Sequence, residues 1–118
     1  MHLETACYLG TTVCPYNRNL TAGGSSGGEG AVIGMHASPL GVGSDIGGSV
    51  RSPAAACGIY SFKPTVGRLS FAGFQAPHFT KGYEGILGTS GPMAGHVEDL
   101  ELYMDIQVNA ELWKKDHT

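Results

Sequence analysis

Short apolar segments, separated by glycine and polar turn residues, follow one another along the 118-residue chain without an internal repeat. Apolar segments of this kind, bounded by turn signals, predict strands. On this pattern we predict strands within residues 6–14, 39–45 and 58–65. Residues 16–24 are rich in turn-forming residues and are predicted to form a loop.

Three further segments have the composition or the spacing of helices. Residues 26–36 are small and apolar, as is typical of a buried helix, and residues 49–57 predict a short helix that tolerates Pro53 in its first turn. Residues 66–92 show no regular period, so no element is predicted there. A third helix is predicted at about residues 96–108, where apolar positions follow the helical repeat and should face the core: Val97, Leu100, Met104 and Val108, with Tyr103 beside them.

The composition indicates one small domain with little net charge: 42% of the residues are hydrophobic, 14% are charged, and the formal net charge is −3. This balance provides no basic surface of the kind that nucleic acid or an anionic membrane requires, so we expect neither partner. No apolar run approaches the ~20 residues of a membrane span, and the first residues lack the pattern of a signal peptide. We therefore expect an unsecreted, cytoplasmic chain without a membrane span.

The three cysteines, Cys7, Cys14 and Cys57, are an odd number without a C-x-x-C pair. No histidine stands at ligand spacing from them, so a zinc site or a disulfide framework is not expected. Small buried thiols in a reducing compartment are the better interpretation.

Two glycine-rich segments place serines beside glycine pairs, and each precedes a predicted helix: "GGSSGGEG" at residues 23–30 and "GVGSDIGGSVRSP" at residues 41–53. A helix N-terminus presents unpaired N–H groups, which stabilise an anion or a developing oxyanion. A serine nucleophile beside a cluster of N–H groups is therefore the chemistry to test.

Other interpretations of these glycines fail on spacing. A phosphate-binding loop needs a lysine after the last glycine, and a dinucleotide site needs G-x-G-x-x-G, whereas Gly41, Gly43 and Gly47 are spaced G-x-G-x-x-x-G. A G-x-S-x-G nucleophile elbow is absent. The histidines form no local group that could assist a serine, and we expect no catalytic role for His36, His78 or His96.

Residues 23–70 closely resemble the signature region of the amidase signature family, from "GGSSGGEG" through "GSDIGGSVRSP" to "FKPTVGR". The following "LGTSGPMAGHVEDLELYM" is similar to the next segment of that family. "CPYNRNLTAGGSSGGEG" looks closest to acetamidase-like members and the fatty-acid-amide-hydrolase branch. The resemblance implies an α/β fold, with a mixed sheet core flanked by helices. It makes residues 1–118 a partial amidase signature domain, with its signature region at about residues 22–70.

The family hydrolyses carbon–nitrogen bonds of amides with a Ser–Ser–Lys triad, and the resemblance carries its roles to matching positions. Ser49 matches the nucleophile, and Ser25 matches the bridging serine, which family members hold through a cis peptide bond. The backbone N–H groups of the oxyanion hole match Ile46, Gly47, Gly48 and Ser49. We expect a small-molecule amide, either a small or a fatty amide, as substrate and neither a metal nor an organic cofactor.

Three neighbouring polar residues are expected to support this machinery. Asp45 and Arg51 are predicted to brace the nucleophile loop through hydrogen bonds. Ser26 is predicted either to support the bridging serine or to cap the helix that follows it.

The family lysine lies well upstream of the bridging serine, and no lysine precedes Ser25 in this sequence. Lys63, Lys81, Lys114 and Lys115 lack the motif of the catalytic lysine. One hypothesis is that the chain is a truncated part of an amidase-type hydrolase and is inactive by itself. The other is that it is a short non-catalytic remnant, or a piece that binds another chain.

Segments taken from a larger sheet are expected to expose strand edges and apolar faces, as in "AVIGMHASPLGVG" at residues 31–43. Such surfaces favour self-association or pairing with a complementing chain. We therefore expect the lone chain to be poorly soluble or only partly folded.

Overall fold

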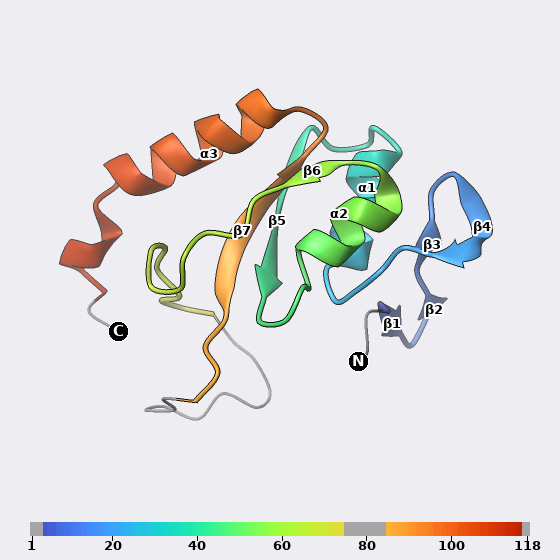
Figure 1. The fold of residues 1–118 in the computed structure, drawn as a ribbon, viewed down its shortest axis with the longest axis horizontal. Helices are drawn as coiled ribbons and strands as arrows, with labels where there is room; N and C mark the ends of the chain where they lie inside the picture. Colours follow the sequence, from blue (N-terminus) through green and yellow to red (C-terminus); the bar gives the residue numbers. More distant parts are fainter. Residues whose placement is uncertain (1–3, 75–84, 117–118) are drawn as a thin grey trace.

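A small antiparallel sheet with helices packed against it forms the centre of the computed structural model, which describes residues 4–74 and 85–116. Two hairpins stand beside it, and Figure 1 shows them next to α1 and α2, with α3 on the opposite side of the sheet. The elements in chain order are β1 (Ala6–Cys7), β2 (Gly10–Thr11), β3 (Val13–Cys14), β4 (Asn17–Thr21), α1 (Gly27–Gly34), β5 (Leu40–Asp45), α2 (Arg51–Cys57), β6 (Tyr60–Ser61), β7 (Thr89–Ala94), α3 (Val97–Asn109) and the 3-10 helix η1 (Leu112–Lys114).

The sheet has the order β5-β7-β6, and β7 is antiparallel to both neighbours. Its register runs from Leu40 opposite Ala94 to Asp45 opposite Thr89. Helix α1 packs against α2, β5 and β7, whereas α3 packs against β7 and β6. The predicted α/β class is therefore confirmed, and the end of β5 leads directly into the second glycine–serine segment.

The core lies where α1, α2 and β7 meet. Ile33, Val50, Ala54 and Met93 form one buried cluster, with Ile59 packed against it. A second cluster, of Ala22, Ala31 and Cys57, joins α1 to α2. Because Ala22 directly precedes the first glycine–serine segment and Val50 lies within the second, the core holds both segments in place.

The N-terminal residues differ from the prediction. Residues 6–14 were expected to form one strand but form three short ones, because the chain reverses at Tyr8 and Leu9 between β1 and β2. The loop predicted at residues 16–24 is also wrong, since β4 pairs with β3 there. All five residues of β4 are exposed, so no buried position marks it as a strand in the sequence.

Strand β7 begins within residues 66–92, where no element is predicted, and it is the central strand of the sheet. It contains Pro92, which cannot donate a hydrogen bond and is normally confined to edge strands. Pro92 stands opposite Val42 of β5, and its carbonyl accepts the Phe62 N–H at 3.1 Å just beyond the two residues of β6. β6 itself is only two residues long, shorter than the strand predicted at residues 58–65.

The predicted helices are present, with shifted ends. Helix α2 begins at Arg51 rather than at Ser49. Helix α1 ends at Gly34, and His36, two residues beyond it, lies in the left-handed region at φ 58°. The His36 and Ala37 N–H groups donate back to carbonyls of the last turn of the helix. His36 thus has a local structural role. No helix within the described residues is long and apolar enough to cross a membrane.

The apolar side of α3 faces the core only in part. Leu100 is buried, as predicted. Tyr103, Met104 and Val108 are half-buried, whereas Val97 is exposed, so the prediction is wrong at that end of the helix.

Candidate active site

The fold brings the two glycine–serine segments into direct contact. Ser25 and Ser26 immediately precede α1, and Ser49 lies just before α2. The Ser26 N–H donates to the Ser49 carbonyl at 3.0 Å. The peptide bond between Gly24 and Ser25 is cis, as the resemblance implies for the bridging serine. The predicted nucleophile and bridging serine therefore lie on adjoining backbone segments, and both are half-buried.

The first segment is held by Thr5, a residue that sequence reasoning missed. Its hydroxyl lies 3.1 Å from the Gly23 carbonyl and 3.0 Å from the Ser25 carbonyl, and it accepts the Gly27 N–H at 2.8 Å. A Cβ on Gly24 would overlap the backbone of Glu4, so glycine is required there by the close passage of the N-terminal segment. Threonine in an irregular stretch gives no sequence signal for such a contact.

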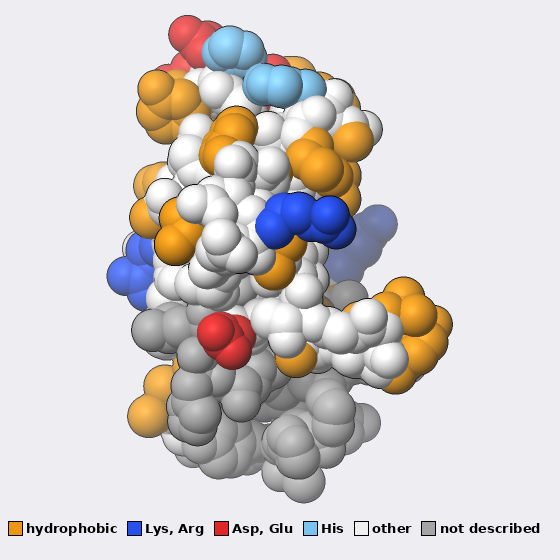
Figure 2. Space-filling model, turned by 90° about the vertical axis from the view of Figure 1, so that its right-hand side faces the viewer, with side chains coloured by type: hydrophobic (Ala, Val, Ile, Leu, Met, Phe, Trp, Pro, Cys, Tyr) orange, Lys and Arg blue, Asp and Glu red, His pale blue; other side chains and the backbone are white. Residues whose placement is uncertain are grey.

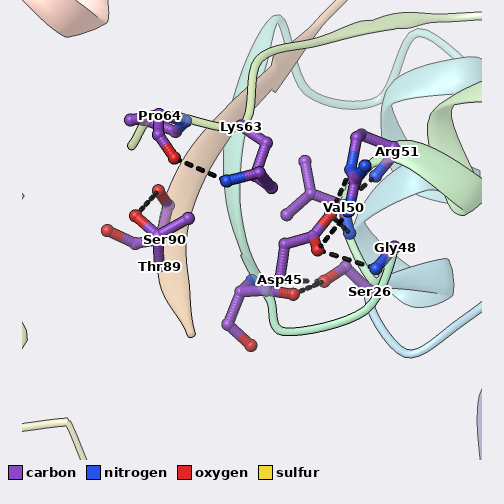
Figure 3. A network of polar contacts seen from close by, with 10 residues as sticks. Ser26, Asp45, Gly48, Val50, Arg51, Lys63, Pro64, Thr89 and Ser90 are labelled. Carbon is purple, nitrogen blue, oxygen red and sulfur yellow. Dashed lines mark hydrogen bonds and ion pairs between the residues drawn. The ribbon is translucent and has the colours of Figure 1, made fainter. Parts of the chain in front are cut away.

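Asp45 organises the second segment from the end of β5. One carboxylate oxygen accepts the Gly48 N–H at 2.7 Å, and the other accepts the Val50 N–H at 3.1 Å and the Arg51 N–H at 3.4 Å. The Arg51 guanidinium adds two bonds, one to each oxygen, both at 3.0 Å. Figure 3 shows Asp45 enclosed by these donors. The brace predicted between Asp45 and Arg51 is therefore present in the structure.

The charge on Asp45 is stabilised despite its burial. The side chain is fully buried, which by itself would raise the pKa of the carboxyl group. The hydrogen bonds from Arg51 and from the backbone N–H groups outweigh this effect and hold the pKa well below its usual range. Asp45 is therefore an anion that fixes the turn at all ordinary pH values.

The turn between Asp45 and Ser49 carries the N–H groups that were expected to bind an oxyanion. Gly48 has φ of 120°, a conformation that favours glycine, and its N–H is directed to Asp45. This finding conflicts with a free oxyanion donor at Gly48. The N–H groups of Ile46, Gly47 and Ser49 have no acceptor among the described residues. Ile46 and Gly47 are exposed, so this part of the turn is open to a ligand.

Ser26 does not cap α1 with its side chain, which corrects one of its two predicted roles. Its hydroxyl instead accepts the Ser44 N–H at 3.3 Å and lies 3.5 Å from the Ser44 carbonyl. The first N–H of the helix, on Gly27, is taken by Thr5. Ser26 thus ties the first serine segment to β5, next to Asp45.

No lysine in the described ranges forms a hydrogen bond with Ser25 or Ser49. The Lys63 amine donates to the Pro64 carbonyl at 2.8 Å and points away from Ser26 (Figure 3). Lys114 forms an ion pair with Glu111. Lys81 and His78 lie outside the described residues.

The cysteines are free thiols. Cys14 and Cys57 are buried, as predicted, and burial raises the pKa of the Cys57 thiol. Cys7 is exposed, so the prediction of a buried thiol is wrong there. In the described part of the chain, no group of three acidic, histidine or cysteine residues could hold a metal ion.

Known proteins share both this sequence and this geometry. The sequence profile described as Amidase matches residues 1–118. The chain is 49% identical to an amidase of Gibberella moniliformis, over 93% of this chain and 21% of that protein. It is 44% identical to an acetamidase of Emericella nidulans, over 92% of this chain and 19% of that protein. A solved fatty acid amide hydrolase matches with a TM-score of 0.88 and 43% identity, over 99% of this chain and 21% of that one. The chain thus spans about a fifth of the length of these relatives.

Proposed function

Because the chain belongs to the amidase family, as its motifs indicated, we propose that it supplies the nucleophile, the bridging serine and the oxyanion-binding N–H groups of an amide hydrolase. Ser49 is the nucleophile and Ser25 the bridging serine of this proposal. Its substrate is a small-molecule amide. The hydrogen bond from the Ser26 N–H to the Ser49 carbonyl carries the proposal, because it joins the two serine segments.

The second support is the turn that Asp45 holds. Fixed N–H groups aimed at developing negative charge lower a reaction barrier by up to ~3 to 4 kcal/mol each. The N–H groups of Ile46, Gly47 and Ser49 are the donors with no acceptor among the described residues. We assign the oxyanion to these three, and Gly48 to the turn that orients them.

The reaction follows from these roles. Ser49 attacks the amide carbonyl carbon while its proton passes through Ser25 to a lysine, which the family resemblance places upstream of Ser25. The oxyanion forms at the N–H groups, the C–N bond breaks, and the departing amine takes the proton back through Ser25. Water then enters by the same relay, breaks the acyl–oxygen bond to Ser49 and releases the acid.

The 118 residues by themselves are not expected to turn over an amide. The lysines of the described ranges are engaged elsewhere or stand apart from the serines, as Lys63 does at the Pro64 carbonyl. Without a neutral amine in reach, Ser25 has no acceptor for the proton of Ser49. We therefore propose that activity requires the family lysine as well as this segment.

A graft tests the proposal. Residues 1–118 replace the matching segment of the Emericella nidulans acetamidase, and acetamide hydrolysis is followed by ammonia release. We expect the graft to be active, and Ser49→Ala to lower kcat on the order of 10^4-fold or more. Ser61→Ala is the matched control, because the half-buried Ser61 lies in β6, away from both serine segments.

Two results would contradict the proposal. Near-native turnover by Ser49→Ala would remove Ser49 as the nucleophile. A folded but inactive wild-type graft would support the alternative, in which the segment is a non-catalytic remnant.

A further inference from the structure

Thr5 connects the β1–β2 hairpin to the turn that carries Ser25. It lies at the base of the β1–β2 hairpin, where its carbonyl accepts the Thr12 N–H at 2.8 Å. Its side chain reaches across about twenty residues of sequence to the turn that carries Ser25. Because the hydrogen bond from Thr12 fixes the backbone of Thr5, it also limits the positions that the Thr5 hydroxyl can take.

Three polar backbone atoms of the serine turn surround this hydroxyl. It accepts the Gly27 N–H at 2.8 Å, and its single proton is donated to the carbonyl of Ser25 at 3.0 Å or of Gly23 at 3.1 Å. Space is tight on this side, since a Cβ on Gly27 would lie against the hydroxyl. The hydroxyl therefore holds the turn both before and after Ser25.

One planar group connects this contact to the nucleophile. The Ser25 carbonyl and the Ser26 N–H belong to the same peptide unit, which is planar and rigid. Thr5 binds the oxygen of this unit at 3.0 Å, and the Ser49 carbonyl accepts its N–H, also at 3.0 Å. Hydrogen bonds to both its oxygen and its N–H therefore fix the plane of the Ser25–Ser26 peptide, which connects Thr5 to Ser49.

We propose that Thr5 is a positioning residue for the bridging serine. It sets the plane of the Ser25–Ser26 peptide, and with it the direction of the Ser25 hydroxyl relative to Ser49. The inference rests on the proposed function, because it assigns Thr5 a role in the proton relay. Thr5 acts through Ser25 and does not itself contact the reacting atoms.

Thr5→Val is the informative change, because valine keeps the branched shape but neither donates nor accepts a hydrogen bond. Thr5→Ser keeps the hydroxyl and is the rescue variant. Thr11→Val is the matched control: the exposed Thr11 lies in the same hairpin, and no hydrogen bond of its side chain is found within the described residues.

The first measurement uses the acetamidase graft. One net hydrogen bond corresponds to a rate effect of roughly 2- to 10-fold, so we expect Thr5→Val to lower kcat by that factor and to leave KM unchanged. Thr5→Ser should restore kcat, and Thr11→Val should match the wild type. A kcat of Thr5→Val equal to that of the wild type would overturn the proposal, as would a failure of Thr5→Ser to restore it.

The second measurement does not depend on activity. Amide hydrogen exchange of Gly27, read in the graft by peptide mass spectrometry, reports whether its N–H has an acceptor. We expect roughly 2- to 10-fold faster exchange at Gly27 in Thr5→Val, with wild-type exchange in Thr5→Ser and Thr11→Val. Unchanged exchange in Thr5→Val would show that the Thr5 hydroxyl does not bind the Gly27 N–H.

The two proposals fail separately. If Ser49→Ala retains turnover, the proposed function is wrong, whatever Thr5→Val does. If Ser49→Ala is inactive and Thr5→Val keeps full kcat, only the role of Thr5 is wrong.

Discussion

Asp45 illustrates at the scale of single residues how a buried charge can build a turn. Five hydrogen bonds converge on its carboxylate, three from backbone N–H groups and two from Arg51. A bond to a charged group contributes about 1.5 to 3 kcal/mol, and a buried donor that loses its partner is costly. Arg51 remains half-exposed, so its share is reduced by solvent. Asp45 therefore holds the conformation of the turn at residues 45–51.

This arrangement predicts a pH dependence of stability. The pKa of Asp45 is lower in the folded chain than the value of about 3.9 for an unfolded aspartate, so the unfolded state binds more protons near that pH. The stability that Asp45 provides is complete above about pH 5 and decreases as the pH falls below about 4. In the acetamidase graft we expect the urea midpoint to fall over this range. Asp45→Asn should flatten that fall and lower the free energy of unfolding at neutral pH by roughly 2 to 3 kcal/mol.

Asp105→Asn provides the control, because Asp105 is exposed on α3. It should keep the pH profile and the neutral-pH stability of the wild type. An Asp45→Asn profile as steep as that of the wild type would show that Asp45 does not control acid stability.

Residue roles differ in how far the sequence reveals them. Asp45 and Arg51 stand inside a motif of fixed spacing, so their pairing could be predicted. Thr5 lies outside any motif, and its partners are backbone atoms of residues far along the chain. Ser26 was assigned two alternatives, and only packing against β5 shows which partner its hydroxyl takes.

At the scale of elements, the outer edge of β5 is covered by side chains of the first serine segment and α1. Strand β5 pairs with β7 on one side only. On its other side the Val42 N–H donates to the Glu29 carboxylate at 3.3 Å, and the Ser44 N–H donates to the Ser26 hydroxyl at 3.3 Å. The expectation of an open strand edge is therefore wrong at the middle of β5, because polar side chains accept the N–H groups of Val42 and Ser44, which another strand would use.

Removal of Glu29 should open this edge. In Glu29→Ala the Val42 N–H loses its acceptor, and β5 can pair with a second chain. We expect faster growth of thioflavin T fluorescence than for the wild type at equal concentration. Glu101→Ala is the matched control, since it removes the same charge from an exposed position on α3. Equal growth in Glu29→Ala and Glu101→Ala would mean that the edge is not protected by this contact.

The elements that the sequence failed to predict share a physical cause. Strand β4 is exposed at every position, and β7 contains Pro92 in the centre of the sheet. Strand signals in sequence come from burial on one face and from residues that can donate to both neighbours. Both segments become strands because the fold places a partner strand beside each of them. Strand pairing, rather than the local preference of their residues, therefore determines their conformation.

At the scale of the whole molecule, the chain exposes more surface than its mass predicts. Its accessible area is 7907 Å², against about 6100 Å² for a compact monomer of this mass. Tyr8 and Leu9 at the turn of the first hairpin are 95% and 80% exposed. Figure 2 shows hydrophobic side chains scattered over the face that carries the hairpins. Residues 31–43 expose only part of their apolar side chains, because Ile33 is buried while Met35 is exposed.

Self-association of the lone chain follows from this surface. Exposed apolar area is covered when chains associate, and the two buried clusters are small for a stable core. We expect a sedimentation coefficient that rises with concentration and a broad thermal transition. Tyr8→Ser/Leu9→Ser should reduce the association, whereas Thr11→Ser in the same hairpin should not. A sharp, cooperative melt of a monomer would contradict this view of the chain.

The sequence by itself determined the family, the α/β class, the three helices and the chemical theme of serines beside N–H groups. Those features are encoded locally, in motifs of fixed spacing, in helical periodicity and in glycines that permit a tight turn. Tertiary structure alone decided the central position of β7, the hydrogen bond from the Gly27 N–H to Thr5 and the hydrogen bond from the Gly48 N–H to Asp45. Each of these is a contact between segments that are brought together only when the core of α1, α2 and β7 is packed, and no pattern within either segment specifies its partner.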